Sequence, residues 1–235
     1  MNLLLTGGTG FFGRALLRRW IDSEKYGISL PKVTVLTRSP ESFLIRYPEF
    51  FGKKWLSFHK GNILDYTSLP HNKTFTHIIH GATESTIGPS LQDLQRYDEI
   101  VNGTRNILNY AVKINVRRVL LTSSGGVYGP QPETLGEIPE SYLGIPDPLD
   151  PMSAYSMAKR ASEHLCCLYN ARFGVETVVA RCFSFVGKDL PLNAHFAIGN
   201  FIYDALHSDE ITITGNGAPI RSYMDQADLA SWLMC

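Results

Sequence analysis

A tyrosine and a lysine four residues apart, Tyr155 and Lys159, lie within a helical pattern. Side chains at this spacing share one face of a helix. An ammonium beside a phenol favours the phenolate, lowering the tyrosine pKa from about 10, so that the phenol can act as an acid and base near neutrality. The spacing alone is common on solvent-facing helices. Its occurrence after a strand that ends in hydroxyl residues, Thr122-Ser123-Ser124, favours a catalytic group that holds and protonates a substrate oxygen.

A glycine-rich turn precedes these residues in the chain. Thr6-Gly7-Gly8-Thr9-Gly10-Phe11-Phe12-Gly13 follows the first predicted strand and opens the first predicted helix. Such glycines permit a tight turn, allow the backbone to approach a pyrophosphate and let helix and strand pack, while the helix amino end faces the anion. We therefore expect Gly7, Gly10, Phe11, Phe12 and Gly13 to bind a dinucleotide.

The loops after the next two strands bear on which dinucleotide binds. The second strand ends in Thr37-Arg38, where an acidic residue would bind an adenosine ribose. Arg38 can instead hold a 2′-phosphate, so NADP is favoured over NAD, and both stay open. Asn62 and Ile63 follow the third strand, and the amide of Asn62 can both donate to and accept from an adenine edge.

Short apolar runs alternate with longer helical patterns along the chain. The runs do not alternate polar and apolar residues, which is typical of parallel strands buried on both faces. We predict an α/β, doubly wound parallel sheet of the Rossmann type over residues 1–180, and a small, incomplete C-terminal substrate lobe over residues 181–235. The predicted strands are Asn2–Thr6, Val33–Thr37, Trp55–His59, His77–His80, Arg118–Ser123, Glu176–Arg181 and Ile211–Thr214. The predicted helices are Gly10–Asp22, Leu91–Ile114, Met152–Phe173 and His195–His207.

The composition argues against several classes of protein. The 235 residues carry 22 basic and 22 acidic side chains, so no basic excess favours nucleic acid. The longest apolar runs fall short of the ~18–20 residues that span a bilayer, and the first residues do not resemble a secretory signal. The four cysteines form no metal-ligand spacing. We expect a cytoplasmic protein with no metal site, no nucleic-acid partner and no membrane partner.

Together, the motifs TGGTGFFG, SSGGVYG (123–129) and YSMAK (155–159) resemble the extended short-chain dehydrogenase/reductase family. The nucleotide-sugar epimerase/dehydratase branch is the most similar. HGAT, NGTRNIL, RCFSFVG and GNGAPIRSYMDQADLA follow in the same order, so the resemblance covers nearly the whole chain.

The resemblance implies roles for particular residues. Tyr155 would be the acid/base, Lys159 would lower its pKa and bind the nicotinamide ribose, and Ser124 would hold the sugar oxygen. Arg221 would contact the substrate diphosphate, and Ser184 stands where epimerases often have asparagine. A homodimer through the helices Leu91–Ile114 and Met152–Phe173 would also follow.

Departures from the family pattern reduce the number of reactions that the chain is expected to catalyse. Similar dehydratases carry Asp-Glu where this chain has Gly125-Gly126, so removal of water is disfavoured. The family usually continues beyond Ala230, and we therefore expect a shortened chain that binds dinucleotide but closes poorly on its sugar.

The motifs predict an NAD(P)-dependent enzyme. The resemblance implies that it epimerises a nucleotide sugar at C4 or reduces a 4-keto sugar, in the formation of polysaccharide precursors. Two alternatives stay open. One is a reductase of a non-nucleotide carbonyl compound, and the other is a protein that senses dinucleotide without turnover.

Overall fold

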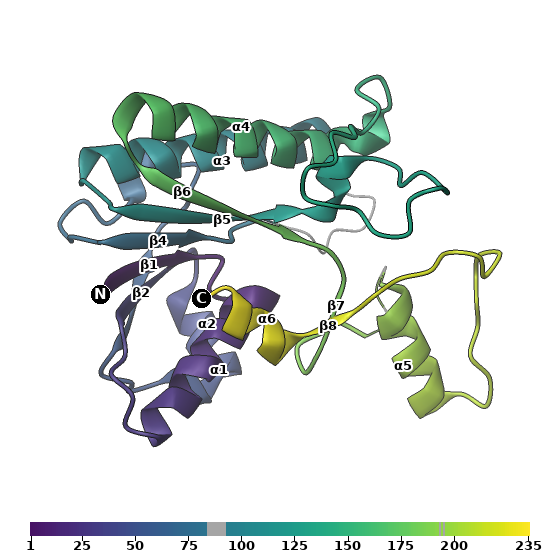
Figure 1. Ribbon diagram of the computed structural model, residues 1–235. Coiled ribbons are helices and arrows are strands. Elements are labelled where there is room, and N and C mark those ends of the chain that lie inside the picture. The colour runs from purple at the N-terminus through teal and green to yellow at the C-terminus, as the bar shows by residue number, and fades with distance from the viewer. Residues whose placement is uncertain (84–92, 193, 195) are drawn as a thin grey trace.

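The computed structural model describes residues 1–83, 93–192, 194 and 196–235. Its centre is a six-stranded parallel sheet in the order β3-β2-β1-β4-β5-β6 (Figure 1). The strands are β1 (Asn2–Thr6), β2 (Lys32–Thr37), β3 (Leu56–Lys60), β4 (His77–His80), β5 (Arg118–Ser124) and β6 (Glu176–Cys182). The order reverses between β1 and β4, which is the point where doubly wound sheets bind their ligands.

Helices cover both faces of the sheet (Figure 1). The helices are α1 (Phe11–Lys25), α2 (Pro40–Arg46), α3 (Asp93–Lys113), α4 (Ala154–Phe173), α5 (Ala197–His207) and α6 (Gln226–Trp232). In β1, Leu3 and Leu5 belong to one apolar core and Leu4 to the other, and all three are at most 1% exposed. Burial on both faces explains the unbroken apolar run, and the predicted fold class is confirmed.

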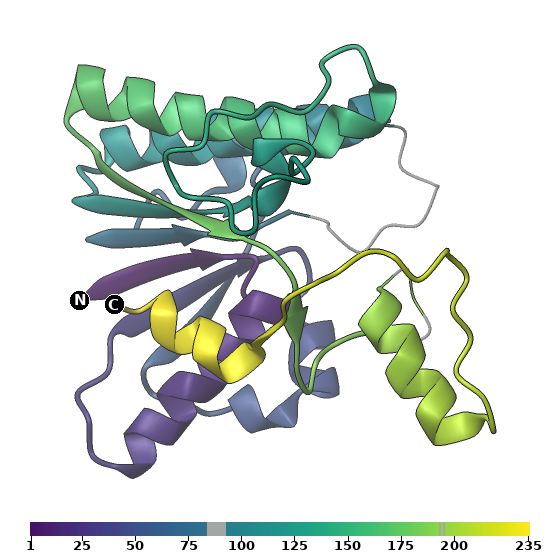
Figure 2. The same cartoon turned by 45° about the vertical axis from the view of Figure 1, so that its right-hand side comes forward.

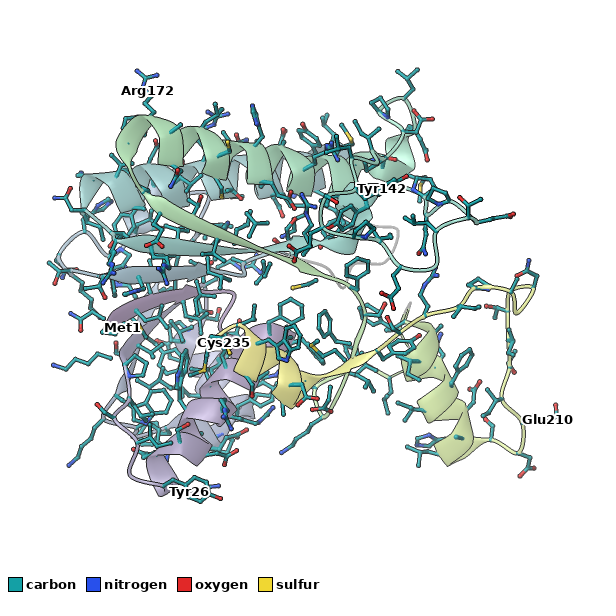
Figure 3. The ribbon with its side chains drawn as sticks, in the orientation of Figure 1. Met1, Tyr26, Tyr142, Arg172, Glu210 and Cys235 are labelled. Atoms are coloured by element: carbon teal, nitrogen blue, oxygen red, sulfur yellow. The ribbon has the colours of Figure 1, made fainter. Side chains whose placement is uncertain are left out.

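The C-terminal segment returns to the sheet domain (Figure 2). Leu229 and Ala230 of α6, and Leu233 just after it, are buried in the same core as Leu16 of α1. Helix α5 and the loop that carries Glu210 stand away from the sheet (Figure 3). The boundary predicted at residue 180 stays a prediction.

One predicted strand is wrong. Residues 211–214 form no strand, and Ile211 and Ile213 are more than half exposed. The segment alternates polar and apolar residues, but a strand also needs a neighbouring strand, and the main-chain N–H of Thr212 instead donates to the Asp204 carboxylate. The pair that does form here is short: β7 (Phe185–Val186) lies parallel to β8 (Met224–Asp225).

The helices shift modestly from their predicted bounds. The predicted start of the long helix at Leu91 lies outside the described residues, as does His195 at the predicted start of the last helix. The predicted start of the helix that carries Tyr155, at Met152, is a 3₁₀ turn over Pro151–Ser153. Gly174, in the left-handed region at φ 70°, ends this helix after Phe173 as predicted.

Candidate active site

A cleft of about 1410 Å³ lies at the carboxyl ends of the strands. It is lined by residues of α1, β2, α3, β5, α4 and β6, of the loops after β1 and β4, and of the C-terminal segment. Of the predicted site residues it is lined by Gly7, Gly10, Phe11, Phe12, Arg38, Asn62, Ile63, Ser124, Tyr155, Lys159, Ser184 and Arg221. Gly13 is buried beneath the turn. The tertiary structure thus brings the predicted residues together, while their individual roles stay predictions.

The glycine turn fits closely under the neighbouring backbone. Gly7 has a φ of 73°, and a Cβ there would stand 2.4 Å from the carbonyl carbon of Gly81, which follows β4. A Cβ on Gly13 would stand 2.3 Å from the Cα of Gly8. Gly10 differs because its Cβ would meet only the Gly7 oxygen, at 3.3 Å, and it lines the cleft.

The amino end of α1 suits an anion. Among the described residues no side chain caps this helix and no acidic residue lies in its first turn. The first N–H groups of a helix lack intrahelical partners and carry partial positive charge. With the close approach possible at Gly10, this turn fits the pyrophosphate of a dinucleotide.

The residues expected around the adenosine lie on the same side of the cleft. Arg38 is exposed at the end of β2. The amide oxygen of Asn62 accepts from the Leu64 N–H at 3.1 Å, which leaves the Nδ2 donor as the group that can meet an adenine acceptor. The Ile63 side chain packs against Gly103 of α3, where a Cβ would stand 2.5 Å from its Cδ1.

Ser124 and Tyr155 meet across the ends of β5 and α4. The Tyr155 hydroxyl lies close enough to the Ser124 hydroxyl for the two groups to interact. Burial raises the pKa of Tyr155 above its ordinary value, and this effect exceeds the opposing ones of the Ser124 hydroxyl and the Arg96 charge. Lys159, which was expected to lower this pKa, is not among the groups that shift it, and desolvation of the phenolate dominates.

Lys159 is 3% exposed and its ammonium is held inside the protein. Its Nζ donates to Thr83 Oγ1 at 2.7 Å and to the Thr122 carbonyl at 2.9 Å. It lies 5.9 Å from the centre of the Tyr155 ring. Burial lowers the pKa of Lys159 from 10.5 to about 8.

The remaining predicted residues lie on the C-terminal side. Ser184 lines the cleft, and its carbonyl accepts from the Met224 N–H at 3.0 Å, which extends the β7–β8 pair. Arg221 is exposed, and its guanidinium donates to the neighbouring Ile220 carbonyl.

A buried carboxylate that the sequence analysis missed joins this side to the glycine turn. Asp189 pairs with Arg14 and Arg18 and accepts from Gln226. Arg14 also donates to the carbonyl of Thr9, and Gln226 donates to that of Phe11, both in the turn. Burial by itself raises the pKa of Asp189, but hydrogen bonds from Arg18 and Gln226 and the charges of Arg14 and Arg18 hold it below its ordinary value. Nothing in local sequence indicates this cluster, since its partners come from distant segments.

Charge along the cleft is strongly biased. Eight lining residues are lysine or arginine and three are aspartate or glutamate, in a chain with no net charge. A cleft lined by one sign of charge concentrates ligands of the opposite sign. The described residues include no cluster of three or more His, Cys, Asp or Glu that could hold a metal ion. None of the described helices is long and apolar enough to cross a bilayer.

Comparison with known proteins places this site in a family. The family model described as "NAD dependent epimerase/dehydratase family" matches residues 3–235. UDP-glucuronic acid decarboxylase 5 of Arabidopsis thaliana is 28% identical over 236 residues, covering 100% of this chain and 65% of that protein. UDP-glucuronic acid decarboxylase 1 of Xenopus tropicalis is 29% identical over 245 residues, covering 99% of this chain and 52% of that protein. The chain thus spans less than two thirds of the length of these curated relatives.

Solved structures show the same fold at lower identity. The crystal structure of a Bacillus anthracis dTDP-glucose 4,6-dehydratase with NAD has a TM-score of 0.82 at 22% identity, covering 100% of this chain and 70% of that one. A Bacillus cereus UDP-glucuronic acid 4-epimerase with UDP-glucuronic acid and NAD has a TM-score of 0.80 at 23% identity, covering 100% and 72%. With the family match over almost every residue and the site described above, this chain belongs to the NAD dependent epimerase/dehydratase family.

Proposed function

We propose that this protein is an NAD(P)-dependent oxidoreductase that acts at C4 of a nucleotide-activated sugar, by epimerisation or by reduction of a 4-keto group. The observation that carries the proposal is the meeting of Ser124, Tyr155 and Lys159 in one cleft with the glycine turn. A bound nicotinamide would supply the hydride acceptor or donor next to these side chains.

Each of the three side chains has a distinct task. Tyr155 exchanges a proton with the sugar oxygen, taking it when a hydroxyl is oxidised and returning it when a ketone is reduced. Ser124 forms a hydrogen bond with the same oxygen and orients it. Lys159 binds the nicotinamide ribose and adds positive charge near the phenol. Because burial raises the pKa of Tyr155, its protonated form dominates near neutrality, and this is the form that donates a proton to a ketone.

The residues after β5 argue against loss of water as the main reaction. Gly125 and Gly126 offer no acid or base, and added side chains would collide with neighbours. A Cβ at Gly125 would stand 2.5 Å from the Phe183 ring, and one at Gly126 would stand 2.4 Å from the Ser156 hydroxyl. Hydride transfer needs only one proton-exchanging group, and Tyr155 provides it.

The positive cleft supports a diphosphate-linked sugar. The curated relatives are named after reactions of UDP-linked and dTDP-linked sugars. We assign Arg221 to the substrate diphosphate, where a guanidinium can bind two oxygens, and Ser184 to orientation of the sugar.

For the cofactor we propose NADP, because Arg38 lies at the end of β2 where it can pair with a 2′-phosphate. Structural relatives are described with NAD, so NAD is the competing outcome. Arg38→Ala should weaken NADPH binding about tenfold or more and leave NADH binding within about twofold. Equal losses for both cofactors would refute the role of Arg38, and these losses can be measured by fluorescence titration.

Decarboxylation of a nucleotide-linked sugar acid is a second candidate, favoured by the relatives in Arabidopsis thaliana and Xenopus tropicalis. Oxidation at C4 turns such an acid into a β-keto acid, which loses CO₂ and leaves a ketone for reduction. The same Ser124, Tyr155 and Lys159 serve both reactions, so the product decides between them.

The test combines binding with product analysis. The purified chain is screened by thermal shift with UDP, dTDP, CDP and GDP, since a bound ligand raises the unfolding temperature. It is then incubated with the matching sugars and each cofactor, beside a Tyr155→Phe control. An epimer or reduced sugar supports the proposal, and a pentose with CO₂ supports the second candidate.

Two outcomes contradict the proposal. If none of the nucleotides stabilises the protein and it reduces a carbonyl compound that carries no nucleotide, the protein is a different kind of reductase. Cofactor binding without turnover of any sugar, unchanged in Tyr155→Phe, identifies a dinucleotide sensor.

We also infer a cytoplasmic protein that serves polysaccharide precursor synthesis and pairs through α3 and α4. Sedimentation of the purified chain tests the pairing.

A further inference from the structure

The described residues contain a hydroxyl that the proposed mechanism does not yet use. Thr83 Oγ1 accepts a hydrogen bond from the ammonium of Lys159 at 2.7 Å, and the Thr122 carbonyl accepts a second at 2.9 Å. An ammonium has three donors in a tetrahedral arrangement. Two bonds to the protein fix the direction of the third, and Lys159 lines the cleft.

The cofactor turn itself sets the position of Thr83. The segment Gly81–Thr83 follows β4, and the Gly81 N–H donates to the Thr6 carbonyl at 3.1 Å. The Ala82 N–H donates to the Thr6 hydroxyl at 3.3 Å. Gly81 also packs directly against Gly7. The hydroxyl that holds the lysine is therefore anchored to the turn that is expected to hold the dinucleotide.

The groups around Lys159 show how its positive charge is stabilised inside the protein. The titratable groups that face the lysine are Tyr155 and Glu163 from α4, Cys182 from β6 and His80 from β4. Glu163 is engaged by Arg181 and by the Ser123 hydroxyl. The direct hydrogen bonds to the ammonium thus come from Thr83 and Thr122 rather than from a carboxylate. An acceptor that bonds the charged form stabilises it and opposes desolvation.

We propose that Thr83 is a positioning residue whose hydroxyl keeps Lys159 in place and protonated beside Tyr155, where the ammonium would hold the nicotinamide ribose. Its effect on catalysis rests on the proposed function, whereas its effect on the lysine does not.

The direct test follows the titration of Lys159 without using activity. Protein labelled with ¹³C at the lysine ε-carbons is titrated by NMR, and Lys159→Arg assigns the signal. Thr83→Val keeps the shape of the side chain but lacks the hydroxyl, and Thr83→Ser retains it. We expect Thr83→Val to lower the proton affinity of Lys159 about tenfold, moving its pKa from about 8 to about 7, and Thr83→Ser to match wild type.

The kinetic test uses the sugar that the product analysis identifies. With Thr83→Val, the alkaline fall of kcat/KM should move to lower pH and kcat should drop about tenfold, while KM for the sugar stays within about twofold. Thr83→Ser should restore both. If Thr83→Val does not fold, Thr83→Ala, which only removes atoms, provides the same comparison.

The outcomes separate the two proposals. An unchanged Lys159 titration in the folded valine or alanine variant overturns the role of Thr83. A shifted titration in a protein that turns over no sugar supports that role and overturns the proposed function instead.

Discussion

Substitution by alanine at two glycines of the turn after β1 should affect two different properties. At Gly10 it should weaken dinucleotide binding, and at Gly13 it should lower the stability of the fold. Gly10 has φ −83° and ψ −174°, which alanine can adopt, and a Cβ there meets only the Gly7 oxygen at 3.3 Å. We expect Gly10→Ala to change the free energy of unfolding by no more than about 0.5 kcal/mol. The added methyl group would keep a pyrophosphate from the α1 amino end, so dinucleotide affinity should fall at least about tenfold, or ~1.4 kcal/mol.

Gly13 is the matched contrast in the same turn. A Cβ there would stand 2.3 Å from the Gly8 Cα and 2.4 Å from the Gly7 oxygen, both backbone atoms that cannot move aside without opening the turn. We expect Gly13→Ala to lower the free energy of unfolding by about 3 kcal/mol. The loss would appear whether or not cofactor is present.

Urea unfolding followed by circular dichroism measures the stability of each variant, and titration of NADH and NADPH measures affinity. Wild-type cofactor affinity in Gly10→Ala would refute the assignment of this turn to the dinucleotide. Wild-type stability in Gly13→Ala would refute the packing argument, irrespective of the ligand.

Substitutions at three further positions test the energetics of the site and of the core beside it. Lys159→Met should raise the free energy of unfolding by about 2 kcal/mol near pH 7, because burial lowers the pKa of this lysine to about 8 and the unfolded chain binds its proton more tightly. The difference in free energy of unfolding between this variant and wild type should shrink as pH rises from about 8 towards 10.5. An equal difference in urea unfolding at both of these pH values would contradict the reasoning. Asp189→Ala should cost about 3 kcal/mol, since Arg14 and Arg18 lose their shared carboxylate. Asp189→Asn should lower the free energy of unfolding by about half as much. The difference in stability between this variant and wild type should disappear as pH falls through the lowered pKa of Asp189. Equal thermal stability of both variants and wild type would rule this out. Leu229→Ala should cost about 2–4 kcal/mol by opening a cavity under α6, and a loss below about 1 kcal/mol would show that α6 contributes little to the core.

Much of the sheet could be predicted from local pattern. β1 and β4 have the predicted bounds, because the middle residues of a strand that is covered on both faces are all apolar. The helix α2 was missed because it is only seven residues long and leaves a weak periodic pattern. The strand predicted at Ile211–Thr214 was wrong because pairing, which local alternation does not report, decides whether a strand forms.

The candidate site divides in the same way. Gly7, Gly10 and Gly13 were recognisable from spacing because the turn that they form is local. Tyr155 and Lys159 were recognisable because one helical turn separates them. Asp189 was not, because its partners Arg14 and Gln226 lie 175 and 37 residues away in the chain.

The sequence by itself determined the alternation of strands and helices, the glycine-rich turn after β1 and the helical face that carries Tyr155 and Lys159. Only the tertiary structure decided how these groups ionise: the pKa of Tyr155 rises rather than falls, and that of Lys159 falls to about 8. It also decided that Thr83 holds the ammonium and that Phe183 and Ser156 close the space at Gly125 and Gly126. The physical reason is that desolvation and close packing depend on segments far apart in the chain, whereas periodicity and turn geometry depend on neighbours.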